Sequence, residues 1–219
     1  MENIPTQYLD GHCKPILSRG IVWNWTRSEE TDIRPCPSGS SGLANFACKE
    51  SRWSKYGPNM GSCKSSMISD LEDDVRRQEP ENVIISNLAR FIKRNQNPQF
   101  FGGDIDGAVA VIRTLTDRLQ YLFQTETKPF PNKKSYMQEF FQNIVRSVSA
   151  LISKEMMKSW MDLDKDRKMN LITNIFSALD DSAFLLADFI NNPEILEETS
   201  LNLGKETNFY LRIKSLNYC

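Results

Sequence analysis

Four of the five cysteines lie in the first third of the chain, at Cys13, Cys36, Cys48 and Cys63. Thiols can bind a metal ion or oxidise to disulfides, and their spacing separates the two chemistries. Zinc ligands usually occur as close pairs about two to four residues apart, whereas these cysteines are 23, 12 and 15 positions apart. An even number of cysteines in a short segment rich in glycine, proline and serine is typical of a secreted module. The spacing favours two disulfides, with three pairings open at this point.

The other residues that could do chemistry do not form an active-site pattern. The single histidine, His12, lies in a polar N-terminal segment, so no nucleophile has an evident general base. Gly102-Gly103 lacks the lysine and the preceding strand of a phosphate-binding loop. The acidic run 162–166 lacks the glycine and the closing glutamate of a calcium loop. We therefore expect no catalytic residue, no metal site and no cofactor, and we expect that the chain is not an enzyme.

Charge and hydropathy argue against a nucleic-acid partner and against a membrane-spanning segment in this sequence. The formal net charge is −1 and the basic pairs Arg76-Arg77 and Lys133-Lys134 are isolated, so we expect no nucleic-acid partner. No apolar run reaches the roughly 18–20 residues that span a bilayer. The polar segment from Met1 to Gly11 is not a signal peptide. An extracellular protein with this sequence would therefore need an export signal from elsewhere.

Two further features of the sequence fit an extracellular module. Asn24-Trp25-Thr26 is the only N-glycosylation sequon, which predicts a glycan on Asn24. A domain this small buries little apolar surface, so its aromatic side chains must supply most of its core. An aromatic cluster can also bind a ligand, but a structural role is favoured here. The predicted core side chains of the disulfide module are Trp23, Trp25, Trp53 and Phe46, and Trp160 is the predicted aromatic core residue of the later part of the chain.

Turn-forming residues and short strands alternate up to about residue 64. The segments 34–42 and 56–61 are rich in glycine, proline and serine and predict turns. Between and before them, residues 20–26 and 43–48 alternate with period two and predict short strands. The pattern changes near residues 64–70, which we take as the boundary between two regions.

After this boundary, apolar residues recur every three or four positions, which predicts helices. The predicted helices cover about residues 67–75, 83–92, 105–122, 136–152 and 171–190, with a short helix over 156–163. Asp104 and Asp164 are predicted N-caps, and Asn191-Asn192-Pro193 is the predicted end of the last helix. Residues 209–213 alternate weakly and predict a strand. The predicted fold class is α+β, mostly α, with a small disulfide-stapled β-rich domain followed by a multi-helix bundle.

Several of these motifs resemble adhesion G-protein-coupled receptors, and latrophilins in particular. The motifs that resemble their hormone-receptor-like domain are Gly20-Ile21-Val22-Trp23, Arg34-Pro35-Cys36-Pro37, Ala44-Asn45-Phe46-Ala47-Cys48, Trp53, Gly57-Pro58 and Cys63. Those that resemble the helical first half of the GAIN domain, the autoproteolysis-inducing domain, are Asn87-Leu88-Ala89-Arg90, Gly103-Asp104-Ile105, Ser159-Trp160-Met161-Asp162 and Ala183-Phe184-Leu185-Leu186-Ala187-Asp188. Their order and spacing agree over about residues 13–200.

The resemblance implies the disulfides Cys13–Cys48 and Cys36–Cys63. It also implies a flexible segment 1–12, a hormone-receptor-like domain 13–64, a helical GAIN subdomain A 65–200 and the start of a further domain at 201–219. The β-sandwich that carries the self-cleavage motif in this family, the membrane helices and the outer modules do not occur in this sequence. Cys219 has no partner left among the cysteines, which favours pairing beyond the end of the chain.

The resemblance implies a non-catalytic extracellular fragment of a latrophilin-like receptor. We expect it to act as a spacer and ligand-interaction module and as a scaffold for the autoproteolytic domain. The expected partner is a cell-surface or extracellular protein, and the longer protein is expected to be anchored in the plasma membrane. The alternative is a secreted, soluble interaction protein, such as a decoy or a splice form, with the same two domains.

Overall fold

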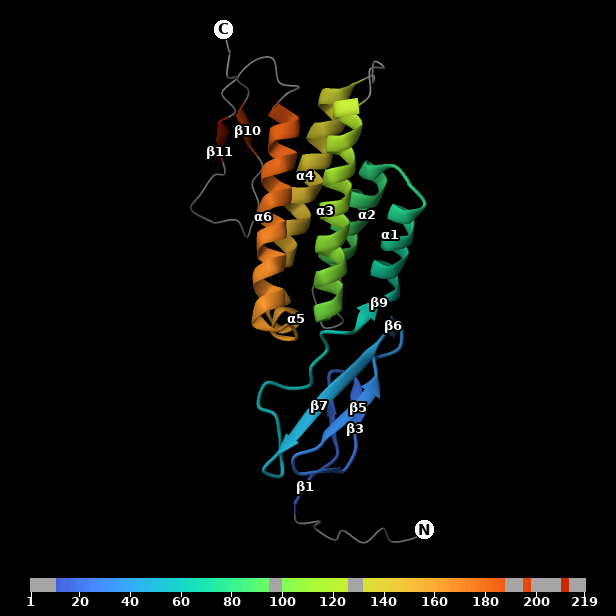
Figure 1. Ribbon diagram of the computed structural model, residues 1–219, viewed down its shortest axis with the longest axis vertical. Helices are drawn as coiled ribbons and strands as arrows, with labels where there is room; N and C mark the ends of the chain where they lie inside the picture. The colour runs from blue at the N-terminus through green and yellow to red at the C-terminus, as the bar shows by residue number, and fades with distance from the viewer. Residues whose placement is uncertain (1–10, 95–99, 126–131, 188–194, 198–209, 213–219) are drawn as a thin grey trace.

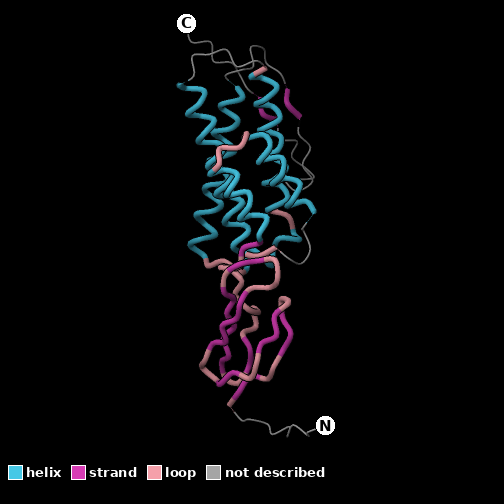
Figure 2. The backbone as a smooth tube through the Cα atoms, turned by 90° about the vertical axis from the view of Figure 1, so that its right-hand side faces the viewer, coloured by secondary structure: helices cyan, strands magenta, loops and turns pink. Residues whose placement is uncertain are grey.

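The computed structural model describes residues 11–94, 100–125, 132–187, 195–197 and 210–212. A small β-rich region and a bundle of long helices are stacked end to end, so the molecule is elongated (Figure 1). The strands of the first region and the helices of the second hardly overlap along the long axis (Figure 2). This is the predicted α+β arrangement, with mostly helical structure, and the prediction of the fold class is confirmed.

The β-rich region consists of short antiparallel strands. Their bounds are β1 His12–Cys13, β2 Ile16–Ser18, β3 Ile21–Trp23, β4 Thr26–Arg27, β5 Thr31–Pro35, β6 Ser40–Ser41, β7 Leu43–Lys49, β8 Arg52–Trp53 and β9 Lys64–Ser65. β5, β7 and β8 form a three-stranded sheet, while β1 pairs with β4, β2 with β3 and β6 with β9. Side chains alternate between the core and solvent along β3 and β7, as period-two patterning requires.

The described residues form six α-helices after the strands, and their bounds are α1 Ser66–Arg76, α2 Glu81–Arg94, α3 Gly102–Thr125, α4 Lys133–Leu151, α5 Met157–Met161 and α6 Lys165–Ala187, with a 3-10 turn at Lys154–Met156. Their apolar faces share one continuous core that reaches from Ile68 to Leu186. α2 packs mainly on α4, and α3 on α6. Beside α6, β10 Ile195–Glu197 pairs with β11 Tyr210–Arg212 (Figure 1).

The structure agrees with most of the predicted elements. The helices lie within a few residues of their predicted positions, because a three-to-four spacing of apolar residues is a strong signal in long segments. Asp164 caps α6, since its Oδ1 accepts a hydrogen bond of 2.8 Å from the backbone N–H of Arg167. A strand was predicted over 209–213, and β11 occupies Tyr210–Arg212. Asn191-Asn192-Pro193 and Cys219 lie outside the described residues.

Four expectations were wrong in detail. The predicted strand 20–26 is two strands, β3 and β4, and the predicted turn 34–42 begins inside β5, which ends at Pro35. A proline fits there because it is at the end of the strand, opposite Leu43. His12, expected in the flexible segment, pairs with Arg27 in β1. β10 lies within residues expected to be helical or connecting.

Within the described ranges, no helix combines the length and the apolar character needed to cross a membrane.

Candidate functional site: the junction between the β-rich region and the bundle

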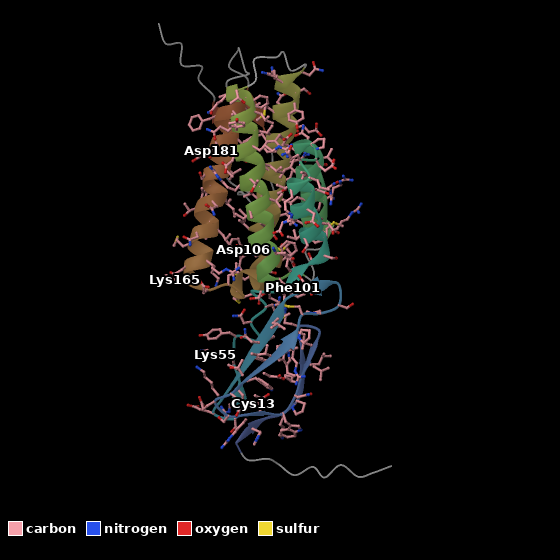
Figure 3. All side chains as sticks on the ribbon, turned by 45° about the vertical axis from the view of Figure 1, so that its right-hand side comes forward. Cys13, Lys55, Phe101, Asp106, Lys165 and Asp181 are labelled. Atoms are coloured by element: carbon pink, nitrogen blue, oxygen red, sulfur yellow. A yellow bond between two sulfur atoms is a disulfide. The ribbon has the colours of Figure 1, made fainter. Side chains whose placement is uncertain are left out.

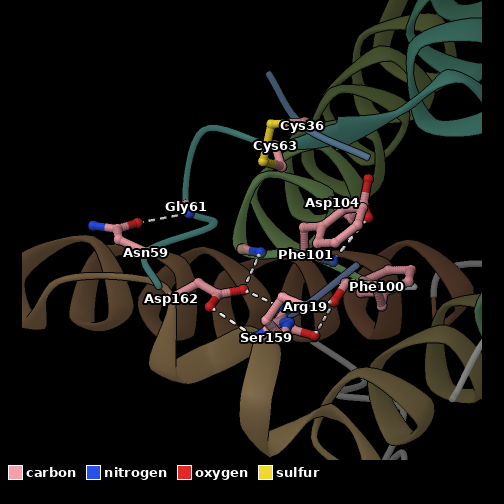
Figure 4. Close-up of polar contacts among 11 residues, drawn as sticks. Arg19, Cys36, Asn59, Gly61, Cys63, Phe100, Phe101, Asp104, Ser159 and Asp162 are labelled. Atoms are coloured by element: carbon pink, nitrogen blue, oxygen red, sulfur yellow. Dashed lines mark hydrogen bonds and ion pairs between the residues drawn. A yellow bond between two sulfur atoms is a disulfide. The ribbon is translucent and has the colours of Figure 1, made fainter. Parts of the chain in front are cut away.

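The β-rich region has one disulfide toward each of its two ends. Cys13 is bonded to Cys48 and Cys36 to Cys63, with Cα–Cα distances of 5.9 and 5.6 Å, which is the pairing that the family resemblance implies. Cys13 lies toward the end remote from the helices (Figure 3). The Cys36–Cys63 bond lies beside the bundle, close to the start of α3 (Figure 4). This second disulfide therefore fixes the part of the β-rich region that meets the helices.

Three aromatic side chains form the centre of the β-rich core. Trp23 is fully buried, and its ring meets that of Phe46 edge to face at a centroid distance of 5.3 Å. Phe46 stacks on the half-buried Trp53 at 4.6 Å. Trp25, by contrast, is exposed, so its predicted place in the core was wrong. It follows Asn24 beyond the end of β3, and because Asn24 and Trp25 are both exposed, the alternation of buried and exposed residues ends at Trp25.

Trp160 lies in the other region. It is partly buried against the helical core, and its indole Nε1 donates a 2.8 Å hydrogen bond to the carbonyl oxygen of Leu151. This bond ties α5 to the end of α4. It places the short helix α5 where its last turn faces the β-rich region.

Phe100 and Phe101 are adjacent in sequence but enter different cores. Phe100 belongs to the helical core and its ring lies 5.9 Å from that of Phe91. Phe101 is 4% exposed and belongs to the β-rich core, where it clusters with residues such as Trp23 and Met60. The segment that starts α3 therefore supplies a ring to the interior of the neighbouring region. Burial of such a ring stabilises the contact by about 1.5–3 kcal/mol.

An arginine from the β-rich region also reaches the bundle, beside Phe100 and Phe101. Arg19 and Gly20 connect β2 to β3, and both have positive φ angles, 53° and 77°, as a two-residue type I′ hairpin turn requires. The turn projects the Arg19 guanidinium onto the carboxylate of Asp162, with N···O distances of 3.1 and 3.0 Å (Figure 4). Its carbon Cζ also lies 5.8 Å from the centroid of the Phe101 ring. The side chains of Arg19 and Asp162 are only 18% and 4% exposed.

Asp162 is held by both regions. It is the C-cap residue of α5, and its Oδ2 accepts a 3.1 Å hydrogen bond from the backbone N–H of Gly102, the first residue of α3. Next to it, the Ser159 hydroxyl donates a 2.6 Å bond to the carbonyl oxygen of Phe100, which Arg19 also contacts. A buried carboxylate with a bidentate guanidinium and a helix N–H has its hydrogen-bonding needs met. The cluster therefore joins the β2–β3 turn, α3 and α5 at one point.

Asp104 makes a second connection on the far side of Phe101. It was predicted as an N-cap, but α3 begins at Gly102, so Asp104 lies in the first turn of the helix. Its fully buried carboxylate accepts bonds from the backbone N–H groups of Ser65, at 2.6 Å, and Phe101, at 2.9 Å. It thus satisfies one free N–H before α3 and joins α3 to the end of β9. The N-cap prediction was wrong by about one turn, and the same side chain connects the two regions.

Glycines permit the backbones to approach closely at this junction. A Cβ atom at Gly61 would lie 2.6 Å from the carbonyl oxygen of Asp162, and one at Gly103 would lie 2.4 Å from that of Cys63. A Cβ at Gly102 would lie 2.8 Å from the Cβ of Asp162. Real Cβ atoms essentially never come within 3.0 Å of other heavy atoms. Any other residue at Gly61 or Gly103 would push the two regions apart, and any other residue at Gly102 would push the start of α3 away from the end of α5.

The rim of the junction carries ion pairs that are more exposed. Arg167 of α6 binds Asp106 of α3 at 2.7 Å, and Lys64 binds Glu72 of α1 at 2.7 Å. Exposed pairs of this kind contribute little to stability, about 0–1 kcal/mol each. The buried contacts of Arg19, Phe101, Asp104 and Asp162 therefore dominate the energetics of the junction.

Burial raises the pKa of the carboxyls of both Asp104 and Asp162 above the ordinary value of 3.8, and at Asp162 the charge of Arg19 opposes the rise. Just above pH 3.8, these two carboxyls therefore bind more protons in the folded chain than in the unfolded chain. We expect the contribution of these groups to the free energy of unfolding to be largest at low pH and to fall as pH rises through the raised pKa values. Urea unfolding across pH 3.5–7 should show this slope, and it should be smaller in the Asp104→Asn variant. An equal slope in both proteins would contradict the assignment to Asp104.

Sequence reasoning placed the disulfides and most of the aromatic core but missed the junction. No sequence pattern links Arg19 to Asp162, because 143 residues separate them. One signal was available: glycines at positions 61, 102 and 103 flank the two segments that meet, and glycine allows close backbone approach.

Asn24 is exposed in the structure, and its glycosylation stays a prediction.

The helical region matches a model of a known protein family. The GAIN family model described as AGRL2-4 GAIN subdomain A matches residues 64–187, which is more than half of the chain. The chain therefore belongs to this family, the GAIN subdomain A of adhesion G-protein-coupled receptors. The family is an extracellular receptor region and not an enzyme family, in agreement with the expectation that the chain is not an enzyme.

Individual relatives narrow this to latrophilin-like receptors. Adhesion G protein-coupled receptor L1 from Mus musculus and from Homo sapiens is 26% identical over 212 residues, which cover 87% of this chain and 14% of each receptor. Latrophilin Cirl from Drosophila ananassae is 22% identical over 232 residues, 81% of this chain and 13% of that protein. The chain thus spans only a small part of the length of these relatives. It corresponds to a piece of the extracellular region of a latrophilin-like adhesion receptor.

Proposed function

We propose that this chain is a non-catalytic, rigid spacer in a receptor whose longer form is anchored in the plasma membrane. The observation that carries the proposal is the junction, where Phe101 completes the β-rich core and Arg19 binds the buried Asp162. Buried contacts of this kind restrict domain motion, which is otherwise the default expectation for neighbouring domains. The spacer would hold the outer modules at a fixed distance, and these would bind a cell-surface or extracellular protein ligand.

The bundle also offers a surface on which a following domain could rest. Exposed apolar side chains gather on α5 and α6, and they are Met157, Met161, Met169, Ile172, Phe176 and Phe184. A concentration of exposed apolar side chains usually marks an interaction site. Because the relatives extend far beyond the matched part, we assign this surface to contact with the autoproteolytic domain.

The spacer proposal predicts a single, narrow distance between the two regions. Spin labels at Lys55→Cys in the β-rich region and Asn174→Cys on α6, in a Cys219→Ser background, would report it by pulsed electron spin resonance. Both positions are exposed, so the labels should not disturb either core. We expect a distribution as narrow as that of the matched pair Lys93→Cys and Asn174→Cys, which lies wholly within the bundle. A broad or multiple-peaked distribution for the first pair would reject the spacer role.

The scaffold proposal predicts that one substitution has different effects in the short and the long protein. Phe176→Asp changes a side chain that is 61% exposed, so the stability of this chain should change by less than about 0.5 kcal/mol. In the full-length receptor, the buried charge should lower self-cleavage and surface delivery, measured by immunoblot and surface labelling. Asn174→Asp, also on α6, is the matched control. Normal cleavage and delivery of the Phe176→Asp receptor would argue against a contact at this face.

A further inference from the structure

The β2–β3 hairpin carries an exposed apolar pair on its outer face. Leu17 and Val22 are directly opposite each other in the register of the two strands. Their side chains are 71% and 61% exposed, although the neighbouring Ile21 and Trp23 are buried. Single exposed apolar residues are common, but two that face each other across a hairpin form a continuous apolar surface.

Asn24 follows on the same face of the chain. Val22 and Asn24 are both exposed while Trp23 between them is buried, so the alternation along β3 continues one residue past its end and puts Asn24 on the side of Val22. The backbone at Asn24 is fixed, because its N–H donates a 3.0 Å bond to Asp32 Oδ2. Its carbonyl oxygen accepts a 3.0 Å bond from the hydroxyl of the buried Thr26. A group attached to Asn24 therefore starts from a defined point beside Val22.

We propose that Asn24 carries an N-linked glycan whose first sugars pack over the Leu17–Val22 pair. The modification forms a bond between C1 of an N-acetylglucosamine and Asn24 Nδ2. It breaks the bond from that carbon to a lipid-linked pyrophosphate, which leaves as the amide gives up one proton. The donor, a lipid-linked oligosaccharide, is supplied along the export route that an extracellular receptor region takes. The proposal requires export alone and is independent of how the junction behaves.

A covalently attached glycan fits this surface better than a second protein does. A stable protein interface needs about 800 Å² from each partner, and two side chains supply only a small part of that area. Attachment at Asn24 gives the sugar a high effective concentration at the pair, so a weak contact is enough to cover it. The C–H faces of sugar rings and the N-acetyl methyl group are apolar and can shield both side chains from water.

The test uses the chain secreted from animal cells behind a signal peptide. Mass spectrometry of the peptide that contains Asn24 should show the added sugar mass, which Asn24→Gln abolishes and Thr26→Ser keeps. In the glycoprotein, nuclear Overhauser contacts should join the first N-acetyl methyl group to the methyl groups of Leu17 and Val22. Enzymatic removal of the glycan from the folded protein should raise the fluorescence of an apolar dye about twofold or more.

Two double variants distinguish shielding of Leu17 and Val22 by the glycan from a general effect of the glycan on dye binding. In Leu17→Thr/Val22→Thr, which keeps the sequon, removal of the glycan should leave dye fluorescence unchanged. In Met157→Thr/Met161→Thr, which changes two exposed apolar residues of the bundle, the rise on removal should persist. An unmodified Asn24 in the secreted chain would overturn the proposal. So would a glycan without contacts to the two methyl-bearing side chains, or a rise that persists in the Leu17→Thr/Val22→Thr variant.

Discussion

Replacing Phe101 with alanine should lower the free energy of unfolding by about 3–5 kcal/mol, the usual cost of removing a buried phenylalanine ring. The cavity would open in the β-rich core, although Phe101 belongs to the segment that starts α3. Hydrogen exchange should therefore accelerate first at amides of β3 and β7, and the urea midpoint of the whole chain should fall.

Two controls make this expectation specific. Phe100→Ala removes the adjacent ring but opens the helical core, so it should accelerate exchange in α2 and α3 instead. Phe184→Ala removes a ring that is 73% exposed and should change stability by less than about 0.5 kcal/mol. If Phe100→Ala and Phe101→Ala gave the same exchange pattern, the division of the two rings between two cores would be wrong.

The second large effect is expected at the buried ion pair of the junction. Asp162→Ala would leave the N–H of Gly102 without its acceptor and the Arg19 guanidinium with only the carbonyl oxygen of Phe100, at 3.4 Å. Removing one partner of a buried ion pair typically costs about 3–5 kcal/mol, because the remaining charge stays buried and unpaired. Urea unfolding should show this loss, and the distance distribution between the two regions should broaden.

A double-mutant cycle measures how strongly the two residues act together. The combined Arg19→Ala/Asp162→Ala variant should be less destabilised than the sum of the single variants, with a coupling of about 0.5–3 kcal/mol. The more exposed pair Arg167 and Asp106 is the matched control, and its coupling should be about 0–1 kcal/mol. Additive effects at Arg19 and Asp162 would mean that their contact does not hold the junction.

The helices were predictable because their signals are local and repeated. α3 and α6 each carry apolar residues over six turns, so an error of one residue does not alter the assignment. The strands of the β-rich region have two to seven residues, and β5, with the sequence Thr-Asp-Ile-Arg-Pro, resembles a turn more than a strand. Pairing with β7 determines its conformation, and that pairing is not a local property of the sequence.

The candidate site was less predictable for a related reason. The turn at Arg19 does carry a signal, since Gly20 in the second position suits a type I′ turn. Nothing near residue 19 shows that the turn meets Asp162, and nothing near residue 101 shows that its ring leaves the helical core. In the sequence, Asp104 and Asp162 are indistinguishable from the acidic residues that commonly occur near helix ends. Only the three-dimensional arrangement distinguishes them as buried links between regions.

The position of Phe101 limits how the two regions could have been exchanged among proteins. A gene segment that ended at residue 65 would encode every strand from β1 to β9 but not the ring that fills their interior. Recombination at that apparent boundary would transfer a β-rich module with a hole in its core. The two regions should therefore be inherited as a pair, and a protein that carries one without the other needs a substitute for this side chain.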